Sequence, residues 1–321
     1  IEEKRPIVED QLMKYLFNHE KRPLIIGKTD ENGEYLIPSE GELSPSSLSL
    51  IIANRIQKLS LDIDLSNKIQ EIDDLISIEE PLEISIKFKD QDKWVNQILS
   101  ITMRTPGHDE DLVRGFLFNE QIVQNISHIE SIKSFGDKVG QYKIQNKILA
   151  TLNNSQNVNI TKIKREFLTN SSCGVCGKSS LDALEIIKKD KTSLTEPKLT
   201  KEVILQSPEV LRNSQSEFSK TGGIHASGLF TAKGDIVAIK EDVGRHNALD
   251  KLIGHALDQK LLNTNTQFLT CSGRLNFDLV QKALMANIGV LIGVGAPTSL
   301  AIDLAKRSDM TLIGFVKSDS F

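Results

Sequence analysis

The last third of the chain has the most regular order of apolar and polar positions. From about residue 221 onward, short apolar runs alternate with amphipathic stretches. The pattern predicts a β-hairpin over 225–242, then helices over 246–257, 276–288 and 297–309 that alternate with strands over 267–273, 290–295 and 311–317. Pro297 stands at a helix start, where its missing N–H would be unpaired anyway. Strands that alternate with helices indicate a mostly parallel sheet covered on both faces.

The middle of the chain predicts strands and one amphipathic helix. Strand-like runs at 76–88 and 98–104 end at Arg104-Thr-Pro-Gly-His108, and a helix follows over 109–123 with three acidic residues in its first turn. Residues 124–170 read as further strands. We therefore expect a strand-rich subdomain over 73–170. Residues 171–220 form a separate segment with a helix just after Gly177, and 221–321 form an α/β subdomain.

Residues 1–72 carry no recognisable chemistry. A short helical stretch near 10–18 leads to a strand-like run and a turn-rich segment. The apolar run at 49–59 predicts a helix capped by Ser46 or Ser47. We interpret 1–72 as an accessory N-terminal extension.

Length and composition exclude several classes of protein. The 321 residues, 35.7 kDa in mass, predict two domains or one large domain with an extension. The 39 basic against 43 acidic residues argue against a nucleic-acid protein held by bulk charge. No apolar run reaches the ~18–20 residues of a membrane helix. Three cysteines are too few for a disulfide framework, which favours a reducing compartment. The first residues are acidic and polar, unlike a signal peptide.

The strongest chemical motif is Cys173-Gly-Val-Cys176. A nearby helix N-terminus and Lys178 would lower the thiol pKa, which favours a reactive thiolate. A redox disulfide, half of a zinc site and a packed cysteine pair are the alternatives. Zinc needs four ligands, and since Cys271 stands alone a metal site would require histidines.

Two strand-to-helix corners form a second candidate site. One is Asp242-Val-Gly-Arg245-His246, and the other is Cys271-Ser-Gly-Arg274. Ligands of open α/β sheets bind at the carboxyl ends of strands, where helix N-termini attract anions. Arg245 and Arg274 suit phosphate, and Gly273 lets the backbone approach it closely.

The same corners are laid out like those of zinc deaminases, which need His-x-Glu and Cys-x-x-Cys. Here His246 is followed by Asn247 and Ala248, and Arg274 stands where the second cysteine would be. His225 also lacks the glutamate two positions on. The metal site is dismantled and the pocket suits an anion, so no metal is expected.

Several motifs together resemble the formate dehydrogenase accessory sulfurtransferase family (FdhD). They are RTPGHDEDLVRGFLFNE, SSCGVCGK, TGGIHASGLF, EDVGRHNALDK, CSGRLNFDLVQKA and APTSLAIDLA, in the family's order from about Asp73 to Lys317. Residues 1–72 are not covered.

The resemblance implies a cytoplasmic homodimer whose fold is α/β, α+β overall, with a three-layer C-terminal domain similar to cytidine deaminase. Such a protein takes sulfur from a cysteine desulfurase as a persulfide on Cys173 and, with Cys176, passes it to the molybdenum bis-guanine-dinucleotide cofactor of formate dehydrogenase. The family's cofactor-binding stretch falls on Phe315, Val316, Lys317, Ser318, Asp319 and Ser320, where this chain lacks the usual Gly/Arg-rich continuation.

Two pyrophosphates on that cofactor would require a cationic pocket with exposed backbone N–H groups. The candidate ligands are Arg104, His108, His225, Arg245, His246, Ser272, Gly273 and Arg274, with Asp242 as a partner for guanine. A cofactor chaperone without obligatory cysteine chemistry is the second hypothesis, and a zinc-dependent hydrolase or deaminase is the third. Neither zinc, nucleic acid nor a membrane is expected as a partner.

Overall fold

The computed structural model describes residues 51–60, 68–90, 93–139, 142–153, 194 and 196–321. The chain divides into two compact units, and residues 77–321 all belong to the larger one. The predicted elements near 10–18 and just after Gly177 lie outside the described residues.

The predicted helix over 49–59 is wrong. Strands β1 (Ile51–Ser60) and β2 (Lys68–Ser77) instead form a two-stranded sheet. Ile51, Ile52 and Ile56 are β-branched, which favours extended backbone, and pairing with a second strand overrides a short helical period.

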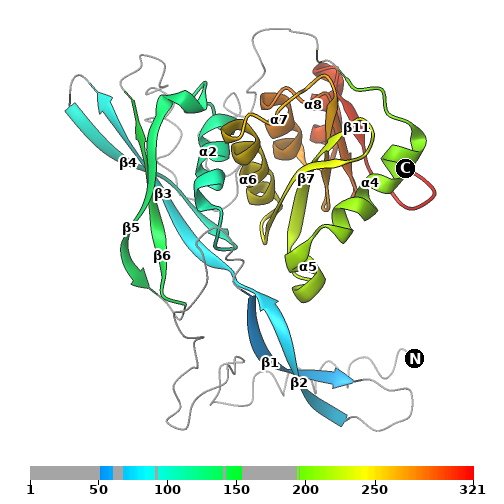
Figure 1. Cartoon of the computed structure of the whole chain (residues 1–321), viewed down its shortest axis with the longest axis horizontal. Coiled ribbons are helices and arrows are strands. Elements are labelled where there is room, and N and C mark those ends of the chain that lie inside the picture. The colour runs from blue at the N-terminus through cyan, green and yellow to red at the C-terminus, as the bar shows by residue number, and fades with distance from the viewer. Residues whose placement is uncertain (1–50, 61–67, 91–92, 140–141, 154–193, 195) are drawn as a thin grey trace. The chain divides into compact units, whose positions relative to one another are not determined.

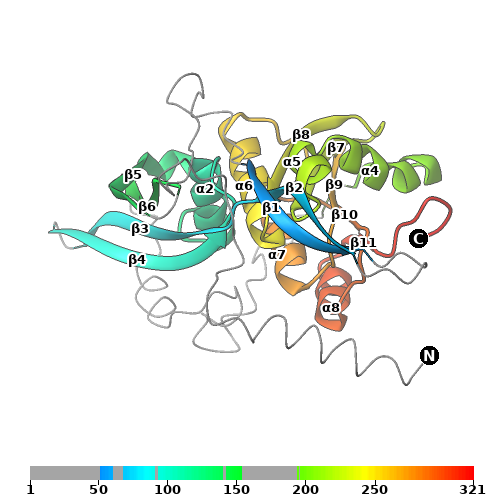
Figure 2. The same ribbon diagram turned by 90° about the horizontal axis from the view of Figure 1, so that it is seen from below.

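The strand-rich part of the larger unit is a four-stranded sheet of order β4-β3-β6-β5 (Figures 1 and 2). Its strands are β3 (Glu80–Asp90), β4 (Lys93–Arg104), β5 (Ile129–Val139) and β6 (Ile144–Leu152). A short 3-10 turn, η2 (Ile126–His128), precedes β5. Helix α2 (Asp109–Asn119) buries Leu112, Val113 and Leu117 against one face of this sheet. The two strands and the helix predicted here are confirmed, although α2 ends before residue 123.

The C-terminal part is a five-stranded sheet of order β11-β10-β9-β7-β8. Its strands are β7 (His225–Thr231), β8 (Ile236–Asp242), β9 (Gln267–Cys271), β10 (Val290–Gly293) and β11 (Thr311–Ile313). The hairpin prediction is confirmed, but a mostly parallel sheet is not. β9, β10 and β11 pair in parallel, whereas β7 is antiparallel to both neighbours because the hairpin places it between β8 and β9.

Helices cover both faces of this sheet, which makes three layers (Figure 1). α6 (Arg245–Asp258), α7 (Phe277–Met285) and α8 (Ser299–Arg307) pack on one face. α4 (Lys201–Asn213), which the sequence reading missed, packs on the other, and α5 (Ser216–Thr221) follows it. α8 begins at Ser299 with Thr298 as its N-cap, so Pro297 precedes the helix and does not start it. The α+β class is confirmed, while the likeness to cytidine deaminase stays a prediction.

Helices α2 and α6 join the two sheets through a glycine contact. A Cβ added to Gly115 would overlap the carbonyl oxygen of Asp250, and one added to Gly254 would overlap that of Asp111. The two backbones therefore pack directly on each other. None of the described helices is long and apolar enough to cross a membrane.

Candidate functional site

The candidate site lies at the edge where β8, β9, β10 and β11 end. β8 and β9 both run antiparallel to β7, and β9 is parallel to β10 and β11, so the four carboxyl ends meet at one edge. His225, the first residue of β7, lies at the same edge opposite Asp242. The two predicted corners are therefore brought together by the sheet.

Direct contacts connect these corners. The Ser272 hydroxyl oxygen accepts a hydrogen bond from Ala226 N at 2.9 Å and lies 3.4 Å from His225 Nδ1. A Cβ on Gly273 would sit 3.3 Å from the His225 ring and 3.5 Å from Arg245 Cδ. The glycine thus allows His225 and Arg245 to close over the backbone of the second corner.

The C-terminal stretch joins the same edge through backbone hydrogen bonds. Gly295 N donates to Gly273 O at 3.1 Å, and Phe315 N donates to Gly295 O at 3.2 Å. Phe315 has a left-handed φ of 56° and an exposed side chain, whereas Val316 is buried in the core. Lys317, Ser318, Asp319 and Ser320 are exposed. Val316 can therefore offer a ligand only its backbone.

Arginine supplies the positive charge of this edge. The Nε of Arg245 is buried without a hydrogen-bond partner, and Arg274 is exposed. Burial, and then the charge of Arg245, lower the pKa of His225. Burial, with Lys282 and Arg245 nearby, lowers the pKa of His246 to about 4. Both histidines are therefore neutral near pH 7, and the cations that remain for an anion are Arg245, Arg274 and the exposed Lys317 of the C-terminal stretch.

His246 faces a cavity of about 260 Å³. Asn276 caps α7 by accepting from Leu279 N, so its Nδ2 donates to His246 Nε2 at 2.9 Å. The neutral ring then carries its hydrogen on Nδ1. Lys282 and Asp250 form a buried pair at 2.7 Å in the same cavity wall. The sequence reading missed Asn276, although an Asn before an apolar helical run is an N-cap signal.

Asp242 is structural and does not face a ligand. Its side chain is fully buried and lies 2.6 Å from Lys251 Nζ, and it also accepts from Gly244 N and Thr105 N. Burial raises the pKa of Asp242, while Lys251 opposes that rise. The suggested pairing of Asp242 with guanine is therefore wrong.

Arg104 and His108 are placed elsewhere. Arg104 is fully buried, paired with Asp109 at 2.9 Å and hydrogen-bonded to Glu80 O and Asn146, so its guanidinium fixes the loop before α2. His108 begins α2 at a φ of 56° and accepts from Lys240 Nζ at 3.0 Å. The structure does not join either side chain to the edge described above.

Cys173 and Cys176 lie outside the described residues. Cys271 is described: it is buried beside Ser227, and burial raises its thiol pKa to about 11, which makes it unreactive. Among the residues that the structure describes, no three His, Cys, Asp or Glu side chains are grouped so as to hold a metal ion.

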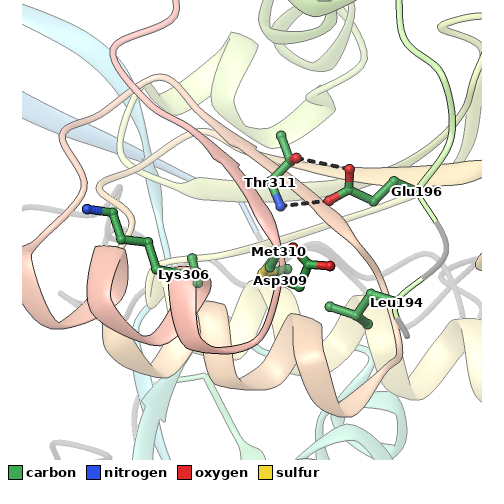
Figure 3. A pocket seen from close by; sticks show the side chains of 7 residues that line it. Leu194, Glu196, Lys306, Asp309, Met310 and Thr311 are labelled. Atoms are coloured by element: carbon green, nitrogen blue, oxygen red, sulfur yellow. Dashed lines mark hydrogen bonds between the residues drawn. The ribbon is translucent and has the colours of Figure 1, made fainter. Parts of the chain in front are cut away.

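A second, more open cavity of about 500 Å³ lies where β11 begins, away from the carboxyl edge (Figure 3). Glu196 accepts hydrogen bonds from Thr311 N and the Thr311 hydroxyl at 2.9 and 3.1 Å. This contact fixes the segment that leads into α4, and none of the predicted site residues lines the cavity.

The fold and the edge together define an α+β protein with two arginines at the carboxyl edge of its five-stranded sheet. The sequence model of the FdhD/NarQ family matches residues 78–321, so the chain belongs to this family. A separate model, described as an indolepyruvate oxidoreductase domain, matches residues 1–77.

Relatives agree with this assignment, and a solved structure has a similar fold. The chain is 40% identical over 249 residues to the sulfur carrier protein FdhD of Sulfolobus acidocaldarius, covering 78% of this chain and 88% of that protein. It is 40% identical over 255 residues to that of Corynebacterium efficiens, covering 77% and 88%. A formate dehydrogenase accessory protein from Desulfotalea psychrophila has a similar fold, with a TM-score of 0.57 at 23% identity, covering 83% of this chain and 94% of that one.

Proposed function

We propose that this chain is a sulfurtransferase that accepts persulfide sulfur from a cysteine desulfurase. It would pass the sulfur to the molybdenum bis-guanine-dinucleotide cofactor needed by formate dehydrogenase. The observation that carries the proposal is the 40% identity to sulfur carrier proteins over 78% of the chain, together with the Cys173-Gly-Val-Cys176 pair. A homodimer is part of the same proposal.

The first step is thiol–persulfide exchange. The Cys173 thiolate attacks the terminal sulfur of the donor persulfide, the bond between the donor's two sulfurs breaks, and the donor leaves as a thiolate. A thiolate is required because the thiol is a poor nucleophile.

The terminal sulfur of the Cys173 persulfide can then be passed on in two ways. Cys176 can attack Cys173 Sγ, which forms a disulfide and expels hydrosulfide toward the cofactor, and a dithiol reductant then resets the pair. Alternatively, Cys176 takes the terminal sulfur and shares it. Only the first route leaves an oxidised pair, so the redox state of the product distinguishes them.

The cofactor is the substrate that would bind at the carboxyl edge. The exposed Arg274 and the partnerless Nε of Arg245 support this assignment, since phosphate oxygens would satisfy both. Because Gly273 has no side chain, its backbone could approach the pyrophosphates closely, as the His225 ring already approaches it.

Intact-protein mass spectrometry after incubation with a cysteine desulfurase and cysteine tests the proposal. We expect a reductant-sensitive gain of ~32 Da on the wild type, lost in Cys173→Ala and retained in Cys271→Ala. Cys271 is the matched control because its buried thiol has a pKa of about 11. No sulfur gain on the wild type, beside a desulfurase shown to be active, would exclude the relay.

A cofactor chaperone is the second candidate function. The arginine-lined edge favours it, because Arg245 and Arg274 could hold an anionic cofactor without any cysteine. Under this hypothesis a double variant, Cys173→Ala with Cys176→Ala, rescues formate dehydrogenase as well as the wild type does. Loss of rescue with cofactor binding intact supports the sulfurtransferase.

A further inference from the structure

We infer that the outer face of strands β3 and β4 is the surface through which two copies of this chain pair, with their strands antiparallel across a two-fold axis. The inference rests on the proposed function, which includes a homodimer, and it names the surface that forms it. The outer face is the one that carries the odd-numbered residues of β3. The even-numbered residues point the other way and are buried with helix α2 in one apolar cluster: Leu82, Ile84, Ile86 and Phe88.

A bulge in β4 gathers its apolar side chains on this outer face. The register between β3 and β4 shifts at Leu99, which has no partner in β3. Without the extra residue, Ile98 and Ile101 would point to opposite faces, because side chains alternate along a strand. With it, four side chains lie opposite odd-numbered residues of β3 and are between 42% and 47% exposed: Trp94, Ile98, Ile101 and Met103.

Strand β4 lacks the residues that usually keep exposed strands from associating. Residues 94–103 include no charged side chain and no proline. Among the described strands, β4 is the outermost one on its side of the four-stranded sheet. Natural proteins commonly place lysine or proline on such strands to prevent association. An outermost strand that is exposed, apolar and uncharged therefore indicates a contact with another protein chain.

The charges beside these apolar side chains have opposite signs at the two ends of the face. At one end, the ammonium groups of Lys87 and Lys89 lie 5.1 and 5.5 Å from the centre of the Trp94 ring. At the other end, Glu83 lies opposite Ile101. If the strands of two copies were parallel, like charges would meet. An antiparallel second copy places lysine against glutamate twice, so the face is complementary to itself.

One position of the axis gives both of these ion pairs. Ser85 lies opposite Ile98, and Lys87 and Glu83 each stand two residues from Ser85 along β3. An axis at the level of Ser85 therefore brings Ile98 against the partner's Ile98. It also brings Lys87 against the partner's Glu83, and Glu83 against the partner's Lys87.

The other half of the outer face is basic. The register of the sheet places Lys147 of β6 and Lys133 of β5 on this face, and both are exposed. Two such halves would repel each other if they met. The contact between the copies therefore centres on β3 and β4.

The same axis brings Trp94 against the partner's Met103, a pairing of an aromatic ring with a thioether that proteins favour. Met103 and Ile101 also line the cavity that His246 faces. The partner subunit's Trp94 would therefore lie beside the wall of that cavity, so pairing adds a residue of the second copy next to the candidate site.

Tryptophan fluorescence of the full chain tests the surface directly, because Trp94 is the single tryptophan of the sequence. We expect the emission to move to longer wavelength on dilution, since separation of the copies exposes the ring to water. The change should follow the fall in mass measured by analytical ultracentrifugation over the same concentrations. A constant emission while the mass halves would place the dimer on another surface. A monomer at every concentration would overturn the inference outright.

Reversal of the charges tests the antiparallel arrangement. Lys87→Glu and Glu83→Lys should each weaken self-association by ~10-fold or more, because each places like charges across the axis. An equimolar mixture of the two variants should pair again, since every contact across the axis then joins a lysine to a glutamate. Asp303→Lys is the matched control, because Asp303 is an exposed carboxylate on α8.

A mixture that stays monomeric, although circular dichroism shows that both variants are folded, would overturn the antiparallel contact. The same holds if Asp303→Lys weakens association as much as Glu83→Lys does. Neither result bears on sulfur transfer, which the persulfide measurement tests separately.

Discussion

Arg245 is the residue on which the chemistry of the edge most depends. Its Nε is buried without a hydrogen-bond partner, and an unpaired buried donor costs ~1–3 kcal/mol. A phosphate oxygen at this position would remove that cost. The neighbouring histidines cannot replace it, because the pKa of His225 is lowered and that of His246 is about 4.

Arg245→Ala and Arg274→Ala should each weaken binding of diguanosine pyrophosphate by ~10-fold or more, the loss of one charge-assisted hydrogen bond. Fluorescence or calorimetric titration measures this. Arg212→Ala is the matched control, since Arg212 stacks on Phe218 and belongs to α4. Equal losses in all three variants would mean that bulk charge, and not the edge, binds the ligand.

The same titration should be nearly independent of pH between 7 and 8. Histidines with their usual pKa of ~6.5 would begin to gain charge, and to strengthen binding of an anion, as the pH falls through this range. Because the pKa values of His225 and His246 are lowered, both rings stay neutral here. A clear gain in affinity from pH 8 to pH 7 would contradict the assignment of neutral histidines.

At the scale of elements, the contact of α2 with α6 fixes how the two sheets meet. Gly115 and Gly254 face the backbone of the opposite helix, at carbonyls of Asp250 and Asp111. Glycine costs ~1 kcal/mol in a helix relative to alanine, so its presence at both points needs a packing reason. The reason is that the two helix backbones touch directly at these points, so there is no room for a side chain between them.

Gly254→Ala should therefore destabilise the protein by about 3 kcal/mol or more, despite the better helix propensity of alanine. Chemical denaturation followed by circular dichroism measures the free energy of unfolding. Gly223→Ala is the control, because a Cβ there meets only Thr221 O at 3.8 Å. A stabilised Gly254→Ala variant would show that the helices are further apart.

At the scale of the whole larger unit, a buried ion pair connects the end of β4 to the corner before α6. Lys251 Nζ contacts Asp242 at 2.6 Å and donates to Thr105 O at 2.8 Å. Thr105 N in turn donates to Asp242, and the Thr105 hydroxyl accepts from Val243 N. The position of Arg245 and His246 thus depends on a residue more than a hundred positions earlier in the chain.

Lys251→Met should cost ~3–5 kcal/mol, because it leaves the buried Asp242 carboxylate without its counter-charge. The double variant Lys251→Met with Asp242→Asn should recover a large part of that loss, since no buried charge is left unpaired. Thermal and urea denaturation of the two variants checks this. A loss below 1 kcal/mol in Lys251→Met would mean that the pair is hydrated.

Much of the larger unit could be predicted from the sequence, because its local patterns agree with its fold. The hairpin, α6, α7 and the strands between them were readable from periodicity and turn residues. Patterns within one segment predicted the wrong structure where pairing with another strand decides it. Residues 51–60 form a strand because β2 pairs with them, and β7 is antiparallel to β9 because of where the hairpin docks.

For the site, the residue types could be read from the chain alone: two arginine corners, a glycine that admits close contact, and a cysteine pair. It could not decide which charges are available to a ligand, because that depends on burial and pairing between distant segments. Arg104 and Asp242 look like ligands in the sequence, yet the fold places each in a buried ion pair. Asp278 and Lys282 lie within the motif CSGRLNFDLVQKA, but only the packing of β3, β4 and α2 against α6 and α7 makes them part of a cavity wall.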